Sequence, residues 1–187
     1  MATRIPGLNS KERGTLAMAS VLLVMLAYGH ILSAIGWLGG GILTAFVLGP
    51  SVRTLAPAAG LEFSAKVLPK VVRFVQSMIV STFLFGVLLL YFYFDGDFSL
   101  LVTTSQGWEL TVGMLLALVT AGIAWTVTLP SFFKVSKVAG VLLSEGKQPP
   151  YPELAKYATR ARKTSLVAIT LLLIVLALMI AAGFGFF

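Results

Sequence analysis

The feature that most constrains this fold is residues 14–52, a run of 39 residues without a charged side chain. An α-helix of that length is about 58 Å long, whereas the hydrocarbon core of a bilayer is about 30 Å thick. The chain is 58% hydrophobic and only 11% charged, and soluble domains carry about 25% charged residues. The run therefore predicts a membrane helix that either tilts and protrudes or bends at its glycines.

Three further apolar segments complete the pattern, and the predicted spans lie at about 15–48, 71–94, 108–130 and 163–184. We expect the first helix to stop before Gly49-Pro50, because proline lacks the N–H that continues the helical hydrogen bonds. We expect this span to be retained, since its apolar run is too long for a signal peptide. The predicted fold class is an all-α membrane protein, a four-transmembrane-helix bundle with long cytoplasmic helix extensions that forms one domain over residues 1–187.

The Lys and Arg residues gather on one side of this pattern. Eleven of the 14 lie in or beside the connections after the first and third spans, which include residues 51–70 and 131–162. Because basic loops stay in the cytoplasm, we expect both connections there and both termini outside the cell membrane. Topology thus explains the net charge of +7, and without a binding motif or aromatic platform we expect no nucleic-acid partner. The expected environment is the lipid bilayer.

His30, the one histidine of the chain, falls near the middle of the first predicted span. Polar groups at that depth are costly and usually face a protein interior or a cavity. A neutral imidazole is a common ligand of haem iron or copper, so His30 is the candidate metal ligand. Trp37 on the same face and Met78 on the second span are the other candidate cofactor-binding residues, with haem or copper as the candidate cofactor. The alternative is an imidazole hydrogen-bonded to the backbone of a neighbouring helix, and the sequence leaves both open.

A glycine cluster follows His30, and its members are Gly36, Gly39, Gly40 and Gly41. Gly36 and Gly40 have the GxxxG spacing that lets membrane helices approach closely. We therefore predict that the cluster packs against another helix, with close approach to a flat cofactor as the alternative. The chain has no cysteine, which excludes thiolate metal sites and disulfides. It also contains no recognisable catalytic motif, so we predict no catalytic residue.

The stretch GHILSAIGWLGGGILTAFVLGP resembles the first-span pattern of the copper-resistance D-like integral membrane proteins and their uncharacterised relatives. The resemblance is carried by His30, Trp37, Gly39, Gly40 and Pro50. The basic connection into the final helix is similar to that family too. A more distant resemblance is to the membrane-bound protoporphyrinogen oxidase family, which has a histidine in an early span. These resemblances imply a helical bundle whose histidine contacts haem or copper.

Three functions fit these observations. The first is a small accessory subunit of a larger membrane complex, respiratory or redox in kind, because the chain has faces for helix packing and no complete catalytic set. Its partners would be other membrane subunits or further copies of the chain. The second is a haem- or copper-binding membrane protein that uses His30. The third is a small transporter or channel subunit. It is the weakest of the three, because the spans contain few polar residues.

Overall fold

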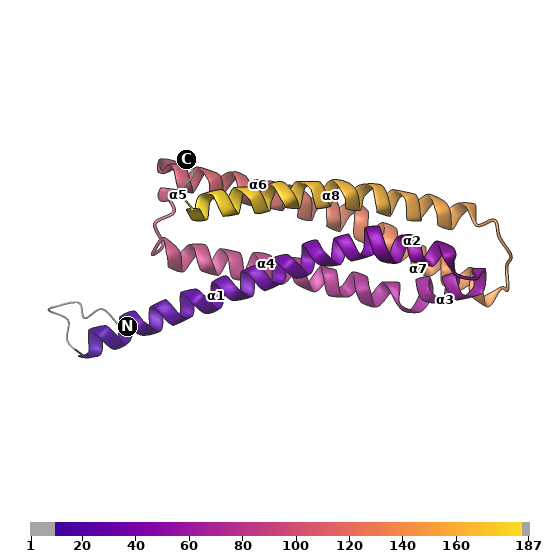
Figure 1. Cartoon of the computed structure of the whole chain (residues 1–187), viewed down its shortest axis with the longest axis horizontal. Coiled ribbons are helices and arrows are strands. Elements are labelled where there is room, and N and C mark those ends of the chain that lie inside the picture. The colour runs from indigo at the N-terminus through magenta and orange to yellow at the C-terminus, as the bar shows by residue number, and fades with distance from the viewer. Residues whose placement is uncertain (1–9, 185–187) are drawn as a thin grey trace.

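The structure, a computed structural model, describes residues 10–184, with side chains over 18–182, and within these residues every element is helical. Figure 1 shows the elements as one elongated bundle. In chain order they are α1 (Ser10–Ile42), the π-helix η1 (Leu43–Leu48), α2 (Gly49–Thr54), α3 (Pro57–Lys66), α4 (Leu68–Tyr93), α5 (Leu100–Thr103), α6 (Ser105–Ile123), the π-helix η2 (Ala124–Thr128), α7 (Leu129–Ser144) and α8 (Pro152–Phe184).

The elements form four helical columns that are each long and apolar enough to cross a membrane. The first column packs along α4, and α6 packs along α8, so the chain forms two antiparallel hairpins. Contacts of α7 with α3 and α4 join the hairpins. The predicted all-α bundle of four potential membrane-spanning helices is therefore confirmed.

The first column does not end at Gly49-Pro50, and that prediction was wrong. The helix continues through η1 and α2 and breaks at Leu55, whose backbone is extended (φ −75°, ψ 155°). The backbone N–H of Gly49 donates to the carbonyl of Thr44, five residues back. Pro50 then occupies the first turn of α2. A π-helical turn lengthens the hydrogen-bond spacing, so Pro50 lies at the start of a new helix. Backbone N–H groups there have no partner within the helix, so the absence of one in proline costs no hydrogen bond.

The third column repeats this arrangement. Leu129 donates its backbone N–H to the carbonyl of Ala124, across η2, and Pro130 follows in the first turn of α7. The helix thus extends well past the predicted end of the third span, to Ser144. Gly146 (φ 60°) then reverses the chain with left-handed backbone geometry that glycine adopts without strain. α8 then begins at Pro152, with Glu153 in its first turn.

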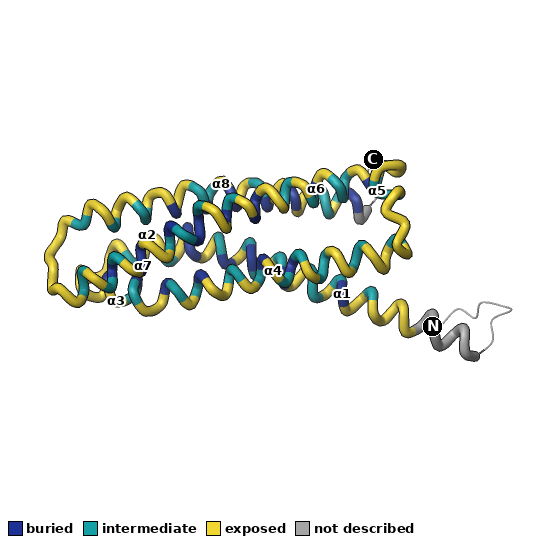
Figure 2. The backbone as a smooth tube through the Cα atoms, turned by 180° about the vertical axis from the view of Figure 1, so that it is seen from behind, coloured by how far each residue is buried: buried dark blue, intermediate teal, exposed yellow. Residues whose placement is uncertain are grey.

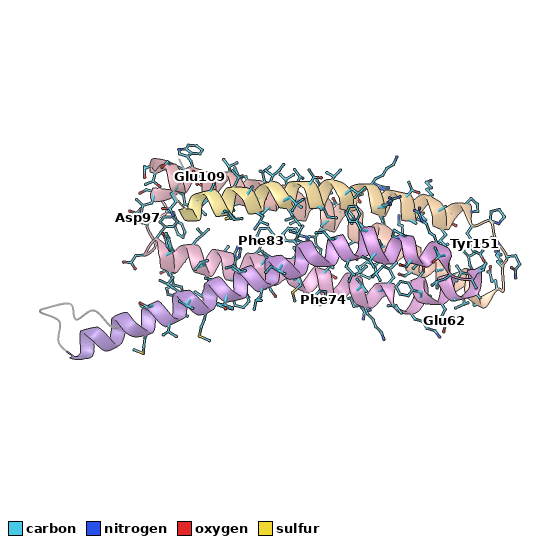
Figure 3. The ribbon with its side chains drawn as sticks, in the orientation of Figure 1. Glu62, Phe74, Phe83, Asp97, Glu109 and Tyr151 are labelled. Atoms are coloured by element: carbon cyan, nitrogen blue, oxygen red, sulfur yellow. The ribbon has the colours of Figure 1, made fainter. Side chains whose placement is uncertain are left out.

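One end of the bundle is basic and the other carries acids. Glu62 and Tyr151 mark the basic end in Figure 3, and Asp97 and Glu109 mark the other. At the acidic end, α4 closes on a turn in which Asp95 (φ 51°) and Gly96 (φ 77°) are left-handed. The Ser99 hydroxyl and the Ser99 backbone N–H both donate hydrogen bonds to the exposed Asp97 carboxylate. These bonds, the hydroxyl's more than the backbone's, lower the pKa of Asp97. Between the predicted spans 71–94 and 108–130 lies the short helix α5, and α6 begins at Ser105.

The core is a narrow seam between the columns, and the outer faces are apolar. Buried side chains such as Trp37, Val72 and Ile79 face inward and form one cluster. Large apolar side chains such as Leu84 and Leu115 point outward, with 56% and 55% of their surfaces exposed. Figure 2 shows the buried residues along the inner faces and the exposed ones outside. Outward-facing apolar surface on this scale suits a lipid environment.

Candidate functional site

His30 is half-buried and points from α1 onto α4. Its Nδ1 lies 2.9 Å from the backbone carbonyl oxygen of Thr82. A carbonyl oxygen only accepts hydrogen bonds, so Nδ1 carries the proton and donates, and Nε2 keeps the lone pair. A Cβ atom at Gly86 would lie 2.9 Å from the same Nδ1, so this glycine makes room for the ring. The role of Gly86 could not be predicted, because a single glycine in an apolar span is common.

Trp37 is 4% exposed and belongs to the central core. Its ring packs against that of Phe83 on α4, with ring centroids 6.1 Å apart. Trp37 and His30 both face the interior of the bundle, yet seven residues of helix separate them, which is about 10 Å. In this structure Trp37 therefore packs between helices rather than beside the imidazole.

Met78 faces α1 at a different level from His30. A Cβ atom added to Gly36 would lie 2.6 Å from the Met78 sulfur, so the thioether fills the space above this glycine. The imidazole instead lies against Gly86, two turns further along α4. The structure therefore brings Met78 to Gly36 and does not bring it beside His30. Within the described residues, no three His, Cys, Asp or Glu side chains gather in a way that could hold a metal ion.

The glycine cluster divides among three directions. Gly36 and Gly40 face α4, where a Cβ atom at Gly40 would lie 2.7 Å from a methyl group of Val75. Gly41 faces Ile169 on α8, at an ordinary contact distance of 3.5 Å. Gly39 faces away from the bundle, and a Cβ atom there would meet nothing within 4 Å. Within the glycine cluster, the close contacts are thus those of Gly36 and Gly40, as their spacing suggests.

A cavity of about 510 Å³ lies at the basic end, between the columns. Most of its lining is apolar, with Leu48, Leu61 and Leu154 as examples, and Arg53 and Arg162 lie at its wall. No acidic residue lines it. This cavity could not be predicted from sequence, because residues from η1, α2, α3, α4, α7 and α8 line it and no single stretch carries a signal.

A smaller void of about 50 Å³ lies deeper in the bundle. Thr44 and Phe132 line both the void and the large cavity, so the two are neighbours. Thr44 of η1 and Thr128 of η2 both line the void, which places the two π-helical turns around one interior space. The Thr128 hydroxyl also hydrogen-bonds that of Thr164 on α8 at 2.9 Å. π-helical turns are often found at functional sites, and here both line the smaller void.

No protein-family model, curated protein or solved structure matches this chain. The resemblance to the copper-resistance D-like proteins therefore stays a prediction.

Proposed function

We propose that this protein is a small accessory subunit that joins a larger membrane complex, respiratory or redox in kind, through the free end of α1. The observation that carries this proposal is the length of α1. Its first turns extend past the ends of α4, α6 and α8, where no other helix of the bundle accompanies them (Figure 1).

The register between α1 and α4 shows where the free end begins. Gly29 lies against Phe85, and α4 ends at Tyr93, eight residues further on. The antiparallel α1 reaches that level near residue 21, so residues 10–20 continue about 16 Å beyond it. At this level α4 has ended, and the segment that follows it is a polar turn with Asp95 and Asp97.

Part of the free end is uncharged. Its described side chains begin at Met18, which is 69% exposed, and residues 14–20 carry no charge, whereas Lys11, Glu12 and Arg13 lie nearer the N-terminus. Uncharged helix at the level of an acidic turn leaves apolar surface near water, which favours a covering partner. An apolar helix from another membrane subunit, packed alongside α1, would provide that cover.

A photoreactive residue at Met18 tests this proposal. We expect irradiation of native membranes to give one discrete, higher-mass adduct at Met18, because a partner helix would lie against it. The matched control is the same residue at Leu84, which is 56% exposed on the middle of α4 and should give lipid adducts only. A chain that gives no protein adduct at Met18, and that purifies alone and folded from native membranes, would contradict the accessory role.

The same proposal assigns an orientation in the cell membrane. The basic end, with residues 51–70 and 131–162, faces the cytoplasm, and both termini lie outside. Because the chain has no cysteine, a single Asp97→Cys variant in the exposed acidic turn reports the side directly. An impermeant maleimide should label it from outside intact cells, and labelling from the inner side alone would reverse the orientation.

A second candidate function is binding of haem or copper by His30. The hydrogen bond to Thr82 is the contact expected of a packing histidine, and it also leaves one ring nitrogen available to a metal. Metal-binding histidines commonly donate the other ring N–H to a backbone carbonyl, which fixes the ring and exposes the free nitrogen. Here the Nδ1–Thr82 bond of 2.9 Å leaves Nε2 as the ligand. A further ligand would come from a partner subunit or a second copy of the chain, because this sequence has one histidine.

Absorption spectra of protein purified from native membranes test this second function. If His30 holds haem, a Soret band should appear and should be lost in His30→Ala. Gly86→Ala should weaken it, since the new methyl group would press on the ring. A purified protein with neither a Soret band nor copper, at every stage of preparation, would remove this candidate.

A further inference from the structure

We propose that the large cavity at the basic end binds an anionic phospholipid of the surrounding bilayer. Arg53 and Arg162 would hold the phosphate, and the apolar walls would hold part of an acyl chain. The proposal is independent of the accessory role, because it concerns the opposite end of the bundle from the free end of α1.

The charge of the wall selects an anion. Arg53 comes from α2 and Arg162 from α8, so two separate columns each supply one guanidinium to the same cavity. The ion pairs of the described residues are Lys66 with Glu62 and Lys147 with Glu145, which leaves both arginines unpaired there. A guanidinium donates paired hydrogen bonds that match the oxygens of a phosphate.

The depth of the cavity favours a lipid over a water-soluble anion. Gly40 lies against Val75, just inside Arg73, where the uncharged part of α4 begins. The lining residues of η1 begin at Thr44, immediately on the basic side of that level. The cavity therefore lies where the uncharged segments give way to charged ones, which is the level of lipid headgroups.

The register of α8 places Arg162 at the same level as the cavity wall. Gly41 lies against Ile169. The two helices are antiparallel, so seven residues forward from Gly41 and seven back from Ile169 place Leu48 level with Arg162. The arginine thus lies beside apolar lining. Arg53 lies further out, while Thr44 lies deeper, next to the smaller void. An amphiphile with its head outward and its chain toward the bundle interior matches this order.

The size and lining of the cavity suit such a ligand. Its volume of about 510 Å³ lies within the roughly 300–1,000 Å³ typical of small-molecule sites. Ser64, Tyr151 and Thr159 add hydroxyl groups to an otherwise apolar wall. Few polar groups set in a mainly apolar wall are usual for sites that bind amphiphilic molecules.

The test uses the full chain in nanodiscs of phosphatidylcholine into which phosphatidylglycerol is titrated. Lipid binding is followed by native mass spectrometry and by the midpoint of thermal unfolding. We expect phosphatidylglycerol to bind and to raise the midpoint. Arg53→Gln and Arg162→Gln should each weaken binding about tenfold, the usual effect of one charge-assisted hydrogen bond.

Two further variants separate the site from general surface charge. Arg160→Gln removes an exposed arginine of α8 that does not line the cavity, so binding should be unchanged. Ala155→Trp fills the cavity from an exposed position of α8 while keeping both arginines, and it should reduce lipid binding as strongly as Arg162→Gln. Both positions are exposed, so the variants should fold.

Four results would overturn the proposal. The first is an equal loss in Arg160→Gln, which would mean that surface charge alone attracts the lipid. The second is equal binding of phosphatidylcholine and phosphatidylglycerol. The third is the same thermal shift with inorganic phosphate, since the apolar walls would then contribute nothing. The fourth is a polypeptide, whether another protein or a second copy of this chain, bound in place of lipid.

Discussion

Replacing Gly40 by leucine should separate α1 from α4 and lower the free energy of unfolding by about 3 kcal/mol, the upper part of the range for overpacked interiors. The new Cβ atom alone would lie 2.7 Å from a methyl group of Val75. Valine is branched at Cβ and has little rotamer freedom in a helix, so it cannot turn aside. Unfolding in mixed detergent micelles, followed by circular dichroism, measures the effect.

Gly39 provides the matched control because it is the adjacent residue of the same helix. Its Cβ direction meets nothing within 4 Å, so Gly39→Leu should leave the free energy of unfolding within about 0.5 kcal/mol of the original, as for other surface substitutions. Gly36→Ala should fall between the two, because the Met78 side chain above it is flexible. Equal destabilisation by Gly39→Leu and Gly40→Leu would contradict the described register of α1 on α4.

This pair of glycines shows how far the sequence could predict the fold. Small residues four apart on an apolar helix predict a close contact, and Gly36 and Gly40 do lie against α4. Gly39 was included in the same cluster, but one residue of helix is a rotation of about 100°, which turns it out of the contact. Sequence spacing identifies a face, whereas the choice of partner helix and its register depend on the whole bundle.

The two proline sites show where local rules fail. Gly49-Pro50 predicts the end of a helix, and an isolated helix would usually end there. The π-helical turn of η1 offers another solution, since the N–H of Gly49 reaches the carbonyl of Thr44 and the helix continues. Leu129 and Pro130 repeat it after η2. A π-helical turn has no firm sequence signature, so the continuation of the helices past Pro50 and Pro130 could not be predicted.

The candidate sites divide in the same way. The position of His30 on an inward face could be predicted from its polarity and from the small residues near it. Its partner could not, because the carbonyl of Thr82 belongs to another helix and carries no side-chain signal. The large cavity at the basic end could not be predicted either, since Arg53 and Arg162 are 109 positions apart in the chain and each alone resembles an ordinary interfacial arginine.

A second large effect is expected at Gly107, where α5 crosses the start of α6. A Cβ atom at this position would overlap the backbone carbonyl of Leu100 and would lie 2.8 Å from the Cα atom of Leu101. Both obstacles are backbone atoms, so no side-chain rotation relieves them. Gly107→Ala should therefore force α5 away from α6 and lower the free energy of unfolding by about 2 kcal/mol, within the usual range for overpacking.

The displacement should also break the hydrogen bonds that hold this corner. The Thr104 hydroxyl accepts a hydrogen bond of 3.0 Å from the backbone N–H of Gly107, which caps α6. The Thr111 hydroxyl donates one of 3.0 Å to the carbonyl of Leu101. Thr104→Ala removes the cap without adding bulk and should cost about 1 kcal/mol, the usual value for an N-cap. Gly107→Ala should thus be more damaging than Thr104→Ala.

Gly122 of α6 separates this local clash from the general effect of replacing a helical glycine. A Cβ atom at Gly122 would meet nothing within 4 Å, and alanine favours helix, so Gly122→Ala should be neutral or stabilising. Hydrogen exchange of residues 97–107 should rise in Gly107→Ala and stay unchanged in Gly122→Ala. If both variants were equally stable and equally protected, the backbone of α5 could not lie against Gly107. The acidic turn and α5 together connect the two hairpins, so the spacing between the hairpins would then need another explanation.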